Sequence, residues 1–255
     1  MTVIHAIRRC RTLMVVLSTV LGLAACATAD PQAELSATDP HEEFNRTMLD
    51  FNLALDRNLL RPAAQGYDFV TPALFKHLLG NGFSHLELPG DFINYLIQGE
   101  INPALETLGR FTINTVLGAG GLLDPATEFG LPKNSTDFGI TLGKHGVDEG
   151  TYWVLPIVGP TTTRDAFGGL VDIAFSPTTY IGVIDSDLTP IVPAALTVTE
   201  KIDQRDRNGD LIDEVLYESE DPYVSLRSIY LQRRRSKVAG DKAGAEALPD
   251  IFDIN

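Results

Sequence analysis

Cysteine is nearly absent from this chain of 255 residues, which has only Cys10 and Cys26. Both lie near the start, so the rest of the sequence offers no pair for a disulfide. Positive charge is also scarce, because 20 Lys and Arg residues stand against 34 Asp and Glu, a net charge of −14. Since nucleic acids are bound through basic patches, this balance argues against nucleic acid as a partner. It argues equally against docking to anionic lipid through a polybasic surface.

A hydrophobic run long enough to cross a bilayer as a helix, about 20 residues, is also missing, so we expect no transmembrane helix in the mature chain. The apolar stretch over 13–25 is too short, and it follows a basic segment with three arginines, the pattern of a signal peptide. It ends in Leu-Ala-Ala-Cys, which resembles the lipobox of bacterial lipoproteins, whose cysteine thiol receives a diacylglycerol. We therefore predict removal of residues 1–25 and lipid attachment at Cys26. The alternative is ordinary cleavage that leaves a free thiol.

Five motifs join Asp, Asn or Thr to a following proline: Asp39-Pro40, Thr71-Pro72, Asn102-Pro103, Asp124-Pro125 and Asp221-Pro222. The first residue accepts hydrogen bonds from the free N–H groups of a first helical turn, and proline has no N–H to leave unpaired. Because alternation with period two is scarce, we predict an all-α fold. One helical domain is expected over 39–238, after a lipidated tether at 26–38 and before a mostly disordered tail at 239–255.

The same signals predict where the helices lie. We expect helices over 40–60, 72–79, 90–98, 103–117, 125–129, 136–143, 163–174, about 188–218, and 222–238. The segment 152–160 is the main extended stretch, and its prolines disfavour a central strand.

The first of these helices carries two apolar stripes. One stripe consists of Phe44, Met48, Phe51, Leu55 and Leu59. The other, roughly opposite, consists of Leu49, Leu53 and Leu60. A helix with two apolar stripes has two apolar neighbours. Either one neighbour is the protein core and the other is acyl chains, which makes the first stripe membrane-facing, or both are helices of one core.

The segment 110–125 is uncharged from Phe111 to Leu123 and contains Gly118, Gly120 and Gly121. A helix from residue 103 to this point reaches only about 20 Å, too short for a bilayer. A dinucleotide-binding loop would need a third glycine where Leu123 stands, and a preceding strand. We predict that Gly118 ends the helix as a left-handed cap. The three glycines either punctuate a loop or serve as a channel lining or hinge.

Signals for catalysis and for metal binding are poor. The segment 82–86 (GFSHL) contains Ser84 but lacks the closing glycine of a nucleophile elbow, and we place it between helices. The histidines fit no zinc-binding spacing. The stretch 204–215 resembles a calcium loop but has Gln204 first and Val215 last, where oxygen ligands are needed, so a polar helix interruption is favoured. We predict no catalytic residue, no metal site and no cofactor.

One basic cluster, Arg233-Arg234-Arg235-Ser236-Lys237, lies near the end of the last expected helix. Positive charge at a helix C-terminus complements the helix dipole, which is the simpler interpretation. A contact with lipid head groups or with an acidic partner is the alternative.

The segment 39–72 carries D-P-x-E-x-F-N-R and R-P-x-A-x-x-Y. These motifs resemble the start of the MlaA/VacJ lipoprotein family, and further blocks follow in the family's order. These are NYLIQGE, LGRFTINTVLGAGGLLDPA, DFGITLGKHGV, YWVLPIVGPTTTRDAFG and DPYVSLRSIYLQRR. The resemblance covers about 39–235 and is weak over 181–220.

The resemblance implies a ring-like helical protein in the inner leaflet of the outer membrane, often bound to a trimeric porin. It implies an amphipathic channel that takes phospholipids misplaced in the outer leaflet and passes them to a periplasmic carrier of the MlaC type, without catalysis or cofactor. Ala27, after the lipidated cysteine, favours outer-membrane sorting. The alternatives are a structural lipoprotein that scaffolds a porin and, from another class, a membrane-anchored lipid hydrolase using a serine such as Ser84.

Overall fold

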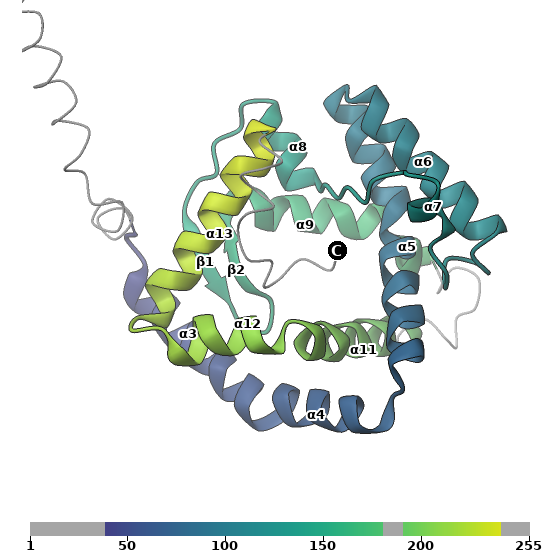
Figure 1. Cartoon of the computed structure of the whole chain (residues 1–255). Helices are drawn as coiled ribbons and strands as arrows, with labels where there is room; N and C mark the ends of the chain where they lie inside the picture. Colours follow the sequence, from purple (N-terminus) through teal and green to yellow (C-terminus); the bar gives the residue numbers. More distant parts are fainter. Residues whose placement is uncertain (1–38, 181–190, 241–255) are drawn as a thin grey trace, which may run out of the picture. The chain divides into compact units, whose positions relative to one another are not determined.

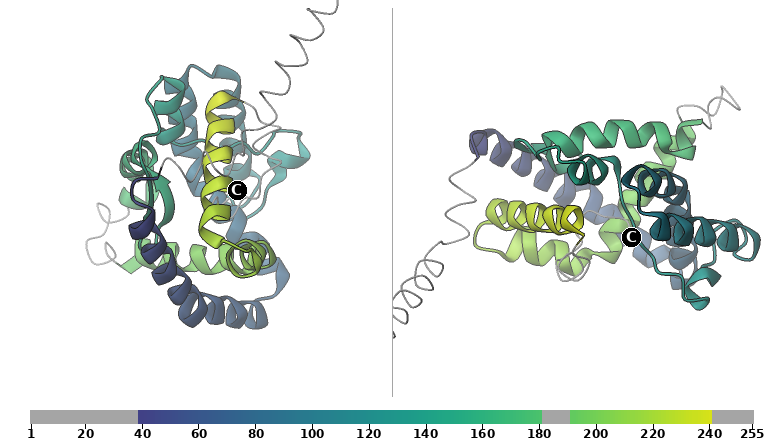
Figure 2. Two further views of the ribbon diagram at one scale, coloured as in Figure 1. Left: turned by 90° about the vertical axis from the view of Figure 1, so that its left-hand side faces the viewer. Right: turned by 90° about the horizontal axis from the view of Figure 1, so that it is seen from above.

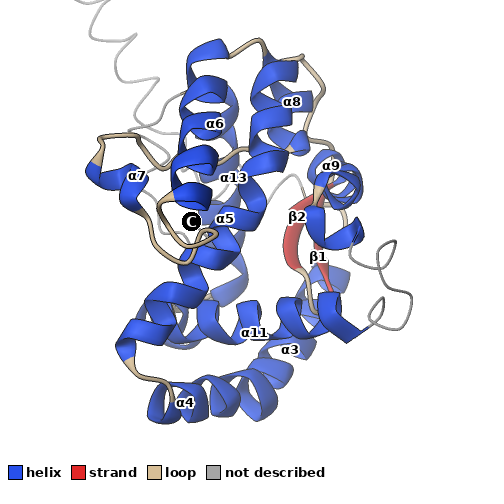
Figure 3. Ribbon diagram, turned by 90° about the vertical axis from the view of Figure 1, so that its right-hand side faces the viewer, coloured by secondary structure: helices blue, strands red, loops and turns tan. Residues whose placement is uncertain are grey.

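The computed structural model describes residues 39–180 and 191–240 (Figure 1). Residues 1–25, Cys26, the tether and all of the predicted tail beyond Gly240 lie outside these described residues. The helical unit begins at His41. It is built of helices with one antiparallel hairpin, so the predicted all-α fold class is confirmed (Figure 3).

The first half of the unit is helical except for its turns. Its elements are α3 (Glu42–Leu55), the π-helical turn η1 (Asp56–Leu60), α4 (Arg61–Val70), α5 (Ala73–Gln98), α6 (Ile101–Val116), α7 (Pro125–Glu128) and α8 (Phe138–Lys144). The second half contains β1 (Tyr152–Leu155), β2 (Gly159–Thr162), α9 (Thr163–Phe175), η2 (Pro177–Tyr180), α11 (Ile191–Arg207), α12 (Gly209–Asp213), η3 (Glu214–Glu218) and α13 (Pro222–Ala239). No helix in these described ranges is both long and apolar enough to span a membrane.

Within this unit the elements follow a closed circuit (Figures 1 and 2). Helix α4 packs on α11, α5 on α6 and α8, and α8 on α9 and α13. Helix α13 then packs on β2 and η3, while α3 packs on β1 and so closes the circuit. Segments far apart in the sequence therefore meet around a shared interior.

Two helices differ from the prediction. A helix was not expected over 61–70, yet the chain continues through η1 into α4. Pro62 is tolerated there because it lies in the first turn of α4, where no N–H is needed for the helical hydrogen bonds. The helices expected over 72–79 and 90–98 are one 26-residue helix, α5, with Pro89 inside it. The gap expected between residues 79 and 90 is therefore helical, and Gly80 within it is buried against the guanidinium of Arg207. Ser84 consequently lies within α5, not between helices.

The extended segment is a hairpin in which Tyr152 pairs with Thr162 and Leu155 with Gly159. Pro160 is accommodated because both strands of a two-stranded sheet are edge strands. The predicted interruption near residue 208 is confirmed, since α11 ends at Arg207 and α12 starts at Gly209.

The prediction for Gly118 is wrong. Helix α6 ends at Val116, and the left-handed residues are Ala119, Gly120 and Gly121. Gly118 is required for space, because a Cβ there would lie 2.4 Å from the carbonyl oxygens of Asn114 and Leu123.

Candidate functional site

Helix α6 is inverted relative to a helix of a soluble protein. Its buried residues are Ala104, Thr107, Arg110 and Asn114, three of them polar. Its outer face carries Ile101, Leu105, Leu108 and Val116, which are 42–72% exposed. A soluble surface helix buries its apolar stripe and exposes its polar one. The outer face of α6 therefore suits an apolar surrounding.

The two apolar stripes of α3 face in different directions. Leu49 is 5% exposed and packs inward, together with Asn45 and Asp56. Phe44 and Phe51 are 47% and 46% exposed. Leu59 in η1 is exposed, whereas Met48 and Leu55 are half-buried. One apolar neighbour of this helix is thus the protein core, and the other stripe faces away from it.

Further exposed apolar side chains extend this surface over several elements. At the α4–α5 corner they are Phe69, Val70, Leu74 and Phe75. On α9 they are Phe167, Leu170 and Ile173, and at the hairpin tip they are Ile157 and Val158. Apolar surface on this scale marks contact with lipid or with another protein.

The glycine loop after α6 is anchored by polar side chains buried beneath it. Arg110 donates to the carbonyl oxygen of Leu131 at 2.7 Å and to Asp124 Oδ2 at 2.8 Å. Asn114 donates to Asp124 Oδ1 at 2.8 Å and accepts from the backbone N–H of Ala126. Burial alone would raise the pKa of Asp124, but hydrogen bonds from Thr127, Asn114 and Arg110 outweigh it and lower the pKa to about 2. The loop is therefore fixed at its end by a charged carboxylate.

His85 supports the same loop from α5. Its ring stacks on Phe111 at 4.9 Å, and its Nε2 lies 3.1 Å from Thr115 Oγ1. Gly121 packs directly on this ring, whereas the space beside Gly120 is open. Burial lowers the pKa of His85. Of the predicted glycines, Gly118 and Gly121 are thus in tight contacts, and their role as channel or hinge residues stays a prediction.

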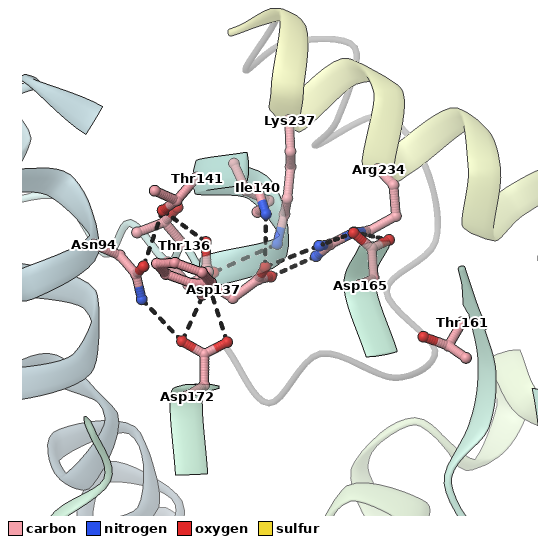
Figure 4. A network of polar contacts seen from close by, with 12 residues as sticks. Asn94, Thr136, Asp137, Ile140, Thr141, Thr161, Asp165, Asp172, Arg234 and Lys237 are labelled. Carbon is pink, nitrogen blue, oxygen red and sulfur yellow. Dashed lines mark hydrogen bonds and ion pairs between the residues drawn. The ribbon is translucent and has the colours of Figure 1, made fainter. Parts of the chain in front are cut away.

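A second polar network joins α13 to α8 and α9 (Figure 4). Arg234 forms ion pairs with both Asp137 and Asp165, and Asp137 also caps α8 by accepting from Ile140 N at 2.8 Å. Burial opposes ionisation of Asp137, but the charge of Arg234 lowers its pKa to about 2. Arg235 instead pairs with Glu149 at 2.6 Å. The basic cluster is therefore divided between the core and the surface, and its interaction with the helix dipole stays a prediction.

A pocket of about 350 Å³ lies among α5, α9, α11, the segment before α8 and the end of α13. Its apolar lining includes Phe83, Leu86, Ile173, Pro193 and Leu196. Its polar lining includes Glu87, Asp91, Asn94, Asp137, Asp172, Glu200 and Lys237. The pocket is thus amphipathic, as a binding site for a molecule with a polar and an apolar part would be.

Asp172 is a half-buried carboxylate of this pocket whose pKa is raised. Both its oxygens accept from the backbone N–H of Phe138, at 3.0 and 3.1 Å, and Asn94 Nδ2 donates to it at 3.0 Å. Burial raises the pKa of Asp172 to about 6 despite these hydrogen bonds. Neither Asp172 nor the pocket was found by sequence reasoning, because both depend on contacts between distant segments.

Ser84 does not lie in a nucleophile elbow. It lies in the middle of a helix, and its hydroxyl oxygen accepts from Lys133 Nζ at 3.0 Å. The ring of the adjacent His85 is engaged with Thr115 and Phe111. The geometry of a strand-to-helix elbow is not present at this serine.

Exposed apolar side chains on several elements, together with buried polar networks and an amphipathic pocket, define a helical protein that works in contact with lipid or a protein partner. The family model described as MlaA lipoprotein matches residues 37–237. The chain belongs to the MlaA lipoprotein family, which confirms the resemblance noted in the sequence.

The relatives are similar over most of their length. The protein of Haemophilus influenzae named "Intermembrane phospholipid transport system lipoprotein MlaA" is 36% identical over 94% of this chain and 96% of its own. The protein of the same name from Escherichia coli K12 is 35% identical over 83% and 82%. A solved chain described under "Structural basis for maintenance of bacterial outer membrane lipid asymmetry" has a TM-score of 0.68, is 36% identical and covers 79% of this chain and 99% of that one.

Proposed function

We propose that this lipoprotein removes mislocalised phospholipid from the outer leaflet of the outer membrane and passes it to a periplasmic carrier. The relatives are named for intermembrane phospholipid transport, and the similar structure is described under the maintenance of outer-membrane lipid asymmetry. Both agree with the function inferred from the sequence. The outer-leaflet source and the carrier, of the MlaC type, are the finer parts of the proposal.

The inverted helix α6 is the observation that supports this proposal. A helix with Leu105 outward and Arg110 inward gains stability in hydrocarbon, where its outer side chains avoid water. On its inner face Arg110 and Asn114 make hydrogen bonds within the protein, so this face is polar. Such a unit offers polar groups to a lipid head within a leaflet, which lowers the barrier to head-group movement without breaking a bond.

The family and the N-terminal sequence support attachment to the membrane through acyl chains. As a member of this family the chain is an outer-membrane lipoprotein. Acylation at Cys26 would anchor it from the periplasmic side, and two or more acyl chains suffice for stable anchoring. The exposed apolar surface then lies in the periplasmic leaflet, and part of it contacts a trimeric porin.

The test is the amount of phospholipid in the outer leaflet of intact cells that lack the protein. Deletion should raise this amount, and the wild-type chain should restore it, whereas Cys26→Ala should not. An unchanged amount on deletion would contradict the transport function and favour the porin scaffold. A hydrolase would instead release fatty acid from phospholipid in vitro and lose this turnover in Ser84→Ala.

A further inference from the structure

The amphipathic pocket has an excess of negative charge. Five carboxylates line it, and among its described lining residues Lys237 is the positively charged one. Asp137 is neutralised by Arg234, which lies outside the lining. The other lining carboxylates are Glu87, Asp91, Asp172 and Glu200, and Glu87 and Asp91 have interactions of their own within the protein. An anionic ligand would meet repulsion here, and a ligand with a positive group would meet attraction.

Two of these carboxylates have no ion-pair partner among the described residues. Asp172 receives its hydrogen bonds from a backbone N–H and an amide, neither of which is charged. Glu200, half-buried on α11, has no hydrogen bond to another described residue. Burial raises the pKa of both carboxyl groups, since it disfavours the charged form. Both carboxylates are half-buried. Because partial removal from water disfavours a carboxylate that has no cation beside it, the pocket gains stability when a cation enters.

The positive residue and the carboxylates are contributed by different elements. Lys237 extends from the last turn of α13 beside Asp137, and Asp172 points into the same region from α9 (Figure 4). Glu200 comes from α11. The pocket thus presents acceptors from two helices and a donor from a third. Its volume, near 350 Å³, suits a head group, and Phe83, Leu86 and Ile173 offer apolar surface to the start of the acyl chains.

We propose that this pocket binds the head group of a zwitterionic phospholipid, with the ammonium held by Asp172 and Glu200 and the phosphate directed toward Lys237. Phosphatidylethanolamine fits, because its ammonium has three donors for carboxylate oxygens. Phosphatidylglycerol does not, since it brings a negative charge with no compensating positive one. The inference rests on the proposed transport function and adds a preference among lipids to it.

The test uses the mature, acylated protein in detergent, equilibrated with vesicles of equal amounts of phosphatidylethanolamine and phosphatidylglycerol. The protein is recaptured, and the lipids bound to it are quantified by mass spectrometry. We expect phosphatidylethanolamine to exceed phosphatidylglycerol by about threefold or more, the size of effect that one partly exposed charge pair gives. Glu200→Gln should bring the ratio close to one, while Asp210→Asn, at an exposed carboxylate of α12 outside the pocket, should leave it unchanged.

A second variant distinguishes binding of the phosphate from binding of the ammonium. Lys237→Gln should lower the total lipid bound and keep the preference, because both lipids have the phosphate. Bound lipid without preference in the wild type, or a preference that survives both Glu200→Gln and Asp172→Asn, would overturn the head-group inference and leave the transport function standing. If neither lipid were recovered with the wild type, both would be wrong.

Discussion

Asn52 holds Ile157 in a backbone conformation that a β-branched residue rarely adopts. The side-chain oxygen of Asn52 accepts from the N–H of Ile157 at 2.7 Å, and its amide donates to the carbonyl of Leu155 at 2.9 Å. Ile157 has φ +69° and is 78% exposed. Such a conformation costs about 1–3 kcal/mol and persists only where neighbouring contacts impose it. Helix α3 thus fixes an apolar hairpin tip away from the core.

Asn52→Ala should release this tip. The loss of two hydrogen bonds should lower the free energy of unfolding by about 1–2 kcal/mol, and amide exchange over 155–159 should accelerate. Asn58→Ala is the matched control, because Asn58 bonds only locally to Ala54 and is exposed. Unchanged exchange at the hairpin in Asn52→Ala would contradict the role assigned to this amide.

The three loop glycines should respond differently to alanine. Gly118→Ala and Gly121→Ala should destabilise strongly, since each Cβ would lie within 2.5 Å of other atoms, whereas Gly120→Ala should cost only about 1 kcal/mol for its positive φ. His85→Ala should partly rescue Gly121→Ala, because it removes the ring that the new methyl group meets. It should not rescue Gly118→Ala, whose neighbours are backbone atoms. Thermal unfolding of the single and double variants checks the order, and equal costs at positions 120 and 121 would refute it.

Adjacent arginines should differ sharply in their contribution to stability. Arg234→Gln leaves Asp137 and Asp165 without their cation and should lower the free energy of unfolding by about 3–5 kcal/mol. Arg235→Gln removes a surface pair with Glu149 and should cost less than about 1 kcal/mol. Urea unfolding of the two variants measures both values. Similar losses would mean that the network around Arg234 is not the anchor of α13.

The pH dependence of stability should contain opposite contributions. The pKa of Asp172 is about 6 in the folded chain, above its usual 3.8, so its contribution favours the fold below the unfolded pKa and is lost as the pH rises toward 6. The pKa values of Asp124 and Asp137 are lowered to about 2, so their contribution is present above the unfolded pKa and is lost as the pH falls toward 2. Asp172→Asn should flatten the change between pH 4 and pH 6 only. The check is the denaturant midpoint as a function of pH across this range, with Asp210→Asn as the control. If the midpoints of the two variants changed with pH by the same amount, the prediction would be wrong.

The outward stripe of α3 should control membrane affinity. In a Cys26→Ala background, Phe51→Asp should lower binding to vesicles by about tenfold or more, because a charge in hydrocarbon costs about 2–3 kcal/mol. Gln232→Glu adds the same charge at an exposed residue of the polar helix α13 and should change binding little. Flotation with vesicles measures both. Normal binding and normal complementation by Phe51→Asp would favour a porin scaffold over a lipid-embedded transporter.

The sequence predicted the helical fold class from local signals that operate within one turn. Helices were expected at all five proline motifs, and each motif lies at or near the start of a helix. The capping mechanism holds at Asp221, which accepts from the N–H groups of Tyr223 and Val224. It does not hold at Asp124, whose carboxylate is bound by Arg110. Local patterns therefore located helix starts better than they assigned the partners of their side chains.

The features that sequence reasoning missed depend on distant contacts. The gap expected between residues 79 and 90 is helical, and Gly80 there packs on Arg207 of α11, a contact that the sequence does not show. The stripes of α3 were found from spacing, but which one faces inward was decided by the burial of Leu49 and Asn45. Asp172 gave no sequence signal, since its perturbed pKa arises from burial beneath α8 and α5.

The inverted helix α6 also bears on quality control in the cell. Because its leucines face outward, part of the free energy that keeps the chain folded comes from whatever surrounds it. A copy that remained in the periplasm would expose this apolar surface to chaperones and proteases. Delivery of the protein to a membrane then determines how long it survives degradation. The abundance of the protein therefore reports how much of it has reached a membrane.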